Sequence, residues 1–112
     1  MATAEDCREA LEGLSRRLEA NGAQASQKLT LDRTLACTIT DLGIAFHGRL
    51  ANSKIIDLDN GDDPTAKIRL TTASDDLIAI VNGSLSVTSA WSRGIIKIQA
   101  NVLDLVKLRT LL

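Results

Sequence analysis

Residues 66–112 read AKIRLTTASDDLIAIVNGSLSVTSAWSRGIIKIQANVLDLVKLRTLL. Two glycines, Gly83 and Gly94, divide this segment, and the pattern predicts a strand, two short helices, a second strand and a final apolar helix. Each helix is preceded by a candidate N-cap residue, namely Ser74, Ser86 and Asn101. We therefore expect strands and helices to be interleaved in this half of the chain.

The final helix has far more aliphatic surface than docking on a sheet requires. An amphipathic helix normally carries an apolar stripe little more than 100° wide. Here most of the circumference is aliphatic: Val102, Leu103, Leu105, Val106, Leu108, Leu111 and Leu112. The clearly polar residues are Asp104, Lys107, Arg109 and Thr110. We expect this helix either to be buried on several sides or to line an apolar space.

The chain before Ala66 predicts one helix and three strands. Thr3 and Asp6 form a capping-box pattern that opens a helix over residues 4–21, and Asn21-Gly22 supplies a stop. Residues 23–30 are expected to be a connector. Alternating apolar residues then predict the inward face of a sheet: Leu35, Cys37, Ile39, Ile44, Phe46, Leu50, Ile56, Leu58, Ala66, Ile68, Leu70, Ile96, Ile98 and Ala100.

These elements predict an α+β fold. Short connections favour a meander, so we expect a five-stranded, mostly antiparallel sheet covered on one face by helices. The length of 112 residues suits a single domain spanning residues 1–112.

Composition excludes several classes of partner. Hydrophobic residues make up 45% and charged residues 24% of the chain, as in soluble globular proteins. A net charge of −1 provides no basic footprint for nucleic acid. Phe46 and Trp91 are the only aromatic residues, so stacking on bases or flat cofactors is disfavoured. An aliphatic interior suits acyl chains or sterols, and it equally suits an ordinary core.

The N-terminal residues are acidic, no apolar segment follows them, and no run reaches the length of a membrane span. We therefore expect a cytoplasmic protein. Cys7 and Cys37 are then expected to be reduced, small apolar fillers. With His47 as the only histidine, no metal site and no cofactor are expected.

No catalytic signature is present. The acidic cluster of Asp57, Asp59, Asp62 and Asp63 does not fit a calcium loop, because Gly61 stands where a ligand is needed. We expect a solvated acidic turn. The serines have no histidine partner in the local sequence, and His47 has no evident nucleophile beside it, so an enzyme is not expected.

The segment from Ser74 to Leu112 resembles the sterol carrier protein 2 family. The matching stretches are SDDLIAIVNG, SAWSRG, IIKIQA and NVLDLVKL, in the order helix, helix, strand, helix. The resemblance implies an apolar tunnel between helices and sheet, and members bind or transfer fatty acids, acyl-CoA, sterols or phospholipids. The chain has no Ser-Lys-Leu ending, which suggests a stand-alone, bacterial-type member.

The residues expected to line such a tunnel are apolar: Phe46, Leu70, Leu77, Ile80, Val81, Trp91, Ile96, Ile98, Val102, Leu105 and Leu108. The same residues would serve equally to fill a solid core, and Trp91 fits either the tunnel mouth or the core. Arg93, Lys97 and Arg109 are candidates for an anionic headgroup, or else solvated surface residues.

The function expected from these observations is non-catalytic carriage of a hydrophobic small molecule, a lipid or sterol, with the C-terminal helix as the gate. The alternative is an interaction or homodimerisation module whose apolar C-terminal helix docks on a partner, an enzyme included. No integral membrane segment and no nucleic-acid partner are expected.

Overall fold

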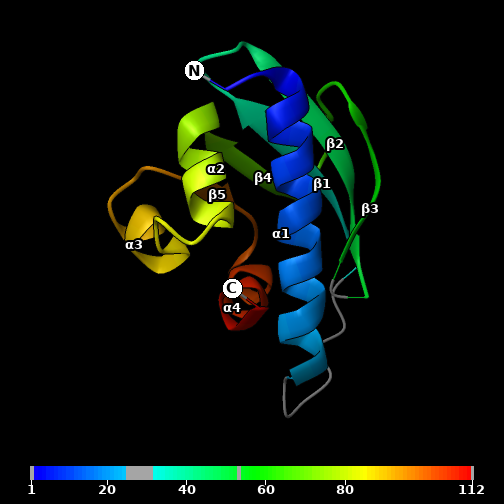
Figure 1. Ribbon diagram of the computed structural model, residues 1–112. Helices are drawn as coiled ribbons and strands as arrows, with labels where there is room; N and C mark the ends of the chain where they lie inside the picture. Colours follow the sequence, from blue (N-terminus) through cyan, green and yellow to red (C-terminus); the bar gives the residue numbers. More distant parts are fainter. Residues whose placement is uncertain (1, 25–31, 53, 112) are drawn as a thin grey trace.

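The computed structural model describes residues 2–24, 32–52 and 54–111. Its elements, in chain order, are α1 (Ala4–Gln24), β1 (Arg33–Ile39), β2 (Ile44–Ala51), β3 (Lys54–Asn60), β4 (Ile68–Thr72), α2 (Ser74–Val81), α3 (Val87–Ser92), β5 (Lys97–Gln99) and α4 (Val102–Leu111). Figure 1 shows the helices gathered on one side of the sheet. The predicted α+β class and the one-sided helical cover are confirmed.

The strands lie in the order β3-β2-β1-β4-β5. β1 pairs with β4 in parallel, with Leu35 opposite Ile68, and the other pairings are antiparallel. The expected simple meander is therefore wrong at β4, because the chain returns from the β3 edge to the free edge of β1. His47 contacts the carbonyl oxygen of Gly61, and Arg69 donates to that of Asp63, so the connecting loop crosses the outer face of the sheet.

The acidic turn is part of this crossing. Asp62 forms an ion pair with Arg69, and Asp63 accepts hydrogen bonds from the backbone and hydroxyl of Thr65. These bonds lower the pKa of Asp63. Asp62 thus ties the loop to the sheet, and the Asp63 carboxylate stabilises the turn within the loop.

β3 contains a bulge that changes which side chains face the core. Asp57 has a φ of 56°, and the register with β2 shifts between His47 and Arg49. As a result, Ile55 and Leu58 pack on the core, while Ile56 lies opposite the exposed Arg49. The prediction that Ile56 points inward is wrong, because the extra residue reverses the alternation.

The core lies between the sheet and the helices. It includes Cys7, Leu11 and Leu14 from α1 together with the predicted inward residues of β1, β2, β4 and β5. Cys7 and Cys37 are free and buried in this cluster, as expected. Burial raises the pKa of the Cys37 thiol to about 12 and also raises that of Cys7.

Most predicted helix boundaries are confirmed by hydrogen bonds. Thr3 and Asp6 exchange two backbone-to-side-chain bonds of 3.0 and 3.1 Å at the start of α1. The side chains of Ser86 and Asn101 accept bonds from the first turns of α3 and α4. The expected stop at Asn21-Gly22 is wrong, since α1 continues to Gln24. One glycine costs a helix only about 1 kcal/mol, which tertiary contacts can offset.

The N-terminus of α2 is capped from a distance. Ser74 does not act as the N-cap as predicted: it is the first residue of the helix, and its side chain is fully buried. Its backbone N–H (2.8 Å) and its hydroxyl both donate to the carboxylate of Asp41 in the β1–β2 turn. These two bonds lower the pKa of Asp41. The carboxylate thus joins the turn to the positive end of the α2 dipole.

None of the helices in the described residues combines the length and the hydropathy that a membrane-spanning segment requires.

Asp41→Asn is expected to lower the urea midpoint at pH 7. Because the carboxylate has a lower pKa in the folded chain than in the unfolded one, its contribution is complete above about pH 4 and disappears as the pH falls through the lowered value. The difference between wild type and variant should therefore shrink in acid. Asp59→Asn, an exposed acid on β3, is the control; equal pH dependence of both variants would contradict the distant cap.

Candidate functional site

α4 lies on the molecule with an unexpected face outward. Val102, Leu103 and Val106 are exposed by 75, 73 and 60%, whereas Asp104 is only 1% exposed. Leu108 is buried beside the core, and Leu105 is partly buried. This helix was expected either to be buried on several sides or to line an apolar space, and burial on several sides is wrong for the exposed three.

An ion pair explains this orientation. Arg33, at the start of β1, donates its Nε–H to Oδ2 of Asp104 at 3.0 Å. The other carboxylate oxygen, Oδ1, is buried and has no hydrogen-bond partner among the described residues. A buried carboxylate needs a counter-charge, so Asp104 faces the sheet where Arg33 can reach it. This single requirement turns the opposite side of α4 toward solvent.

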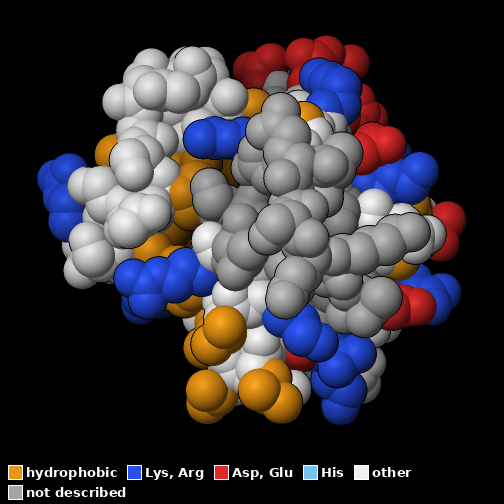
Figure 2. Space-filling view, turned by 90° about the horizontal axis from the view of Figure 1, so that it is seen from below, with side chains coloured by type: hydrophobic (Ala, Val, Ile, Leu, Met, Phe, Trp, Pro, Cys, Tyr) orange, Lys and Arg blue, Asp and Glu red, His pale blue; other side chains and the backbone are white. Residues whose placement is uncertain are grey.

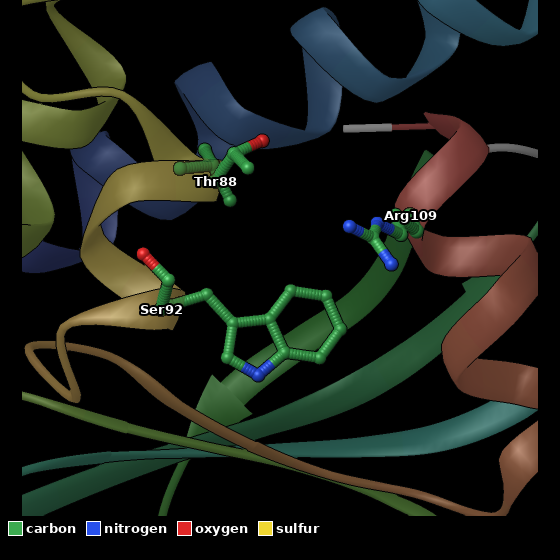
Figure 3. A pocket seen from close by; sticks show the side chains of 5 residues that line it. Thr88, Ser92 and Arg109 are labelled. Carbon is green, nitrogen blue, oxygen red and sulfur yellow. The ribbon is translucent and has the colours of Figure 1, made fainter.

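A pocket of about 310 Å³ lies between α3 and α4. Its lining includes Val87, Thr88, Trp91 and Ser92 from α3 and Arg109 from α4. In Figure 3 the guanidinium of Arg109 reaches from α4 across the space toward α3, where Thr88 and Ser92 lie. The described lining combines an apolar wall with the cation of Arg109, a combination that suits an amphipathic ligand.

Other residues expected to line a tunnel have different positions. The following are buried within the core: Phe46, Leu70, Leu77, Ile80, Ile96, Ile98 and Leu108. Val81 and Leu105 are partly buried against that core, and Val102 is exposed. Of the residues predicted to line a tunnel, Trp91 is the one that the α3–α4 pocket includes among its described lining.

Of the basic candidates, Arg109 lines the pocket, while Arg93 and Lys97 are exposed elsewhere. The sequence interpretation missed Val87, Thr88 and Ser92. Their spacing carried a signal, because Val87 and Trp91, like Thr88 and Ser92, lie four residues apart and share one side of a helix.

A larger and more open groove lies between α1 and α2. It has a volume of about 520 Å³, and its lining includes the charged residues Asp6, Glu9 and Arg16 beside Ile78 and Val81. Acidic and basic side chains on a shallow surface are commonly solvated, so this groove is a weak candidate for a ligand site. The α3–α4 pocket, which Trp91 and Arg109 line, is the stronger candidate for a ligand.

In the described part of the chain, no three His, Cys, Asp or Glu side chains are grouped so that they could hold a metal ion. His47 lies on the outer face of the sheet, with its Nδ1 3.1 Å from the carbonyl oxygen of Gly61. The loop contact accounts for its position.

No protein-family model matches the sequence, and neither does any curated protein. Solved structures with the same fold do match. Sterol carrier protein 2 from Aedes aegypti in complex with palmitate is 23% identical, with a TM-score of 0.64 over 98% of this chain and 94% of that one. Palmitated sterol carrier protein 2 like 2 from Aedes aegypti is 20% identical, with a TM-score of 0.63 over 97% and 92%.

A sec-alkylsulfatase from Pseudomonas sp. also matches, at 22% identity and a TM-score of 0.59 over 88% of this chain. The chain spans only 15% of the length of that sulfatase. Together these similarities confirm the sterol carrier protein 2 fold that the sequence resemblance implied.

Arg33→Ala is expected to lower the free energy of unfolding by about 3 kcal/mol, because it leaves the Asp104 carboxylate buried without a counter-charge. Asp104→Leu should cost less, since the side chain of Arg33 is 39% exposed and can be solvated. The double variant Arg33→Ala/Asp104→Leu should regain most of the loss. Urea unfolding measures all three.

Arg49→Ala is the matched control. Its ion pair with Asp32 lies at the same end of the sheet, with side chains 50 and 56% exposed, so its loss should have a much smaller effect. Equal destabilisation by Arg33→Ala and Arg49→Ala would contradict the role given to Asp104.

Proposed function

We propose that the protein binds an elongated hydrophobic molecule with an anionic head, such as a fatty acid, in the α3–α4 pocket, and carries it without chemical change. The observation that carries this proposal is the pairing of Trp91 and Val87 with Arg109 across one pocket. Two solved proteins of the same fold bind or carry palmitate, which supports an acyl chain as the ligand.

The binding energy would come mainly from the alkyl chain. Burial of apolar surface contributes about 25 cal/mol per Å². An exposed ion pair contributes at most about 1 kcal/mol, so Arg109 would orient the carboxylate rather than hold the ligand. This division favours fatty acids and other anionic acyl lipids over sterols, which have no charge for Arg109.

The small volume of the pocket supports a proposal that α4 moves when a ligand binds. A volume of about 310 Å³ lies at the lower end of the usual range for small-molecule sites, about 300–1,000 Å³. In the described structure, α4 is held by the Arg33–Asp104 ion pair and by Leu108, so few contacts have to change for the helix to shift. We infer that α4 gates the pocket, and that Leu105 and Leu108 join its lining when α4 shifts.

Trp91 provides the measurement. It is the only tryptophan, and the chain has no tyrosine, so the intrinsic fluorescence comes from the pocket itself. A fatty acid carrying a bromine or nitroxide quencher on its chain should quench this emission saturably. Arg109→Gln should weaken binding of the acid about two- to fivefold and leave its methyl ester unaffected.

Ser92→Phe should fill the pocket and weaken binding at least tenfold. Ser84→Phe makes the same change at an exposed serine that follows α2, outside the described pocket lining, and should have no effect. No saturable quenching, or equal binding by the two phenylalanine variants, would exclude this pocket as the lipid site.

A further inference from the structure

The exposed side of α4 forms an apolar ridge made of Val102, Leu103 and Val106. These are the large hydrophobic residues that the described chain leaves mostly open to solvent. In Figure 2 hydrophobic side chains protrude at the lower edge of the molecule, with Lys and Arg side chains beside them. Exposed aliphatic side chains grouped in this way indicate a contact surface.

Cations adjoin the ridge. On the helix, Lys107 lies one turn after Leu103, and Arg109 lies three residues after Val106. The only acidic residue of α4, Asp104, is buried in its ion pair. In the part of the chain that the structure describes, the outer side of α4 therefore presents aliphatic groups beside basic side chains.

A further lysine, Lys67, lies on the sheet at the end where the chain enters α4. Arg69 of β4 lies opposite Gln99 of β5 in an antiparallel pair. Lys67, which is exposed and lies two residues before Arg69, is therefore at the same end of the sheet as Asn101, where α4 begins. Lys67 thus lies at the end of the sheet from which the chain enters α4, whose own cations are Lys107 and Arg109.

Acidic residues gather at the opposite end of the fold. Asp41 contacts the start of α2, whose first turn carries Asp75 and Asp76, and α1 begins with Glu5 and Asp6. Near an anionic surface these acidic residues would turn away from the surface, which favours an orientation with the α4 end toward it.

We propose that the ridge of α4 docks the protein on an anionic lipid bilayer. A stable protein–protein interface involves about 20–30 residues on each side, far more than three ridge residues and their neighbours supply. A short aliphatic ridge with adjoining cations suits the membrane interface, where apolar insertion and attraction to anionic headgroups act together. A second copy of the chain would also bring like charges together, which opposes self-association.

The docked orientation would bring the pocket to the bilayer. Arg109 both lines the α3–α4 pocket and adjoins the ridge, so the pocket edge and the docking surface meet at one side chain. Docking on a bilayer is a separate activity from ligand binding. It depends on the surface of α4, whether or not the pocket holds a lipid.

Sedimentation with vesicles tests the proposal. The protein without added fatty acid should bind phosphatidylcholine vesicles that contain phosphatidylglycerol, and binding should weaken in high salt. Replacing Val102, Leu103 and Val106 together by serine should remove most binding without loss of fold, since all three are exposed. Lys67→Gln should weaken binding about fivefold, the share expected for one basic residue near an anionic membrane.

Lys97→Gln is the matched control. Lys97 is also exposed, but it lies opposite Thr71, about 13 Å further along the sheet at the usual rise per strand residue, so its loss should have little effect.

Undiminished binding by the serine variant, equal effects of the two lysine changes, or no binding to anionic vesicles would overturn the proposal. So would a lipid-free dimer that the serine variant abolishes, because the ridge would then bind a second copy. The fluorescence assay uses no vesicles, so failure of docking and failure of the pocket are separate results.

Discussion

The buried Asp104 carboxylate determines how the C-terminal part of the fold is arranged. Because it must reach Arg33, α4 can adopt only one rotation about its axis, with Asp104 and Leu108 toward the core. Arg109 then extends toward α3, and Val102, Leu103 and Val106 face solvent. One polar residue in an otherwise aliphatic helix thus defines both the pocket and the exposed ridge. An apolar residue at position 104 would be buried at a lower desolvation cost. The ion pair therefore stabilises the fold less than an apolar contact would, but it specifies the orientation of α4.

Local signals made much of the fold predictable. Alternating residues identified the strands, and short-range capping at Thr3, Ser86 and Asn101 marked helix starts correctly, because these bonds join residues three apart. The errors involve longer distances. Ser74 is capped by Asp41, 33 residues away, and Asp57 reverses the β3 pattern through its pairing with β2. The parallel pairing of β4 with β1 likewise depends on a loop that crosses the sheet. Patterns within a short stretch of sequence do not contain the distant residues on which these features depend.

The site was less predictable than the fold. Trp91 and Arg109 were among the expected residues, but most expected lining residues belong to the packed core. Aliphatic residues alternate in the same way whether they fill a space or enclose one, so their pattern does not distinguish the two. The orientation of α4 was hidden for a different reason: Arg33 and Asp104 are 71 residues apart. Helical periodicity alone would have turned the aliphatic side inward.

The two buried thiols have a practical consequence. Alkylating reagents attack the thiolate, and burial holds Cys7 and Cys37 in the protonated form at neutral pH, out of contact with solvent. In the folded protein, a cysteine introduced on the surface would therefore react, while Cys7 and Cys37 would not. Spectroscopic labels can be attached at a chosen position without first removing the natural cysteines, which would leave voids in the core.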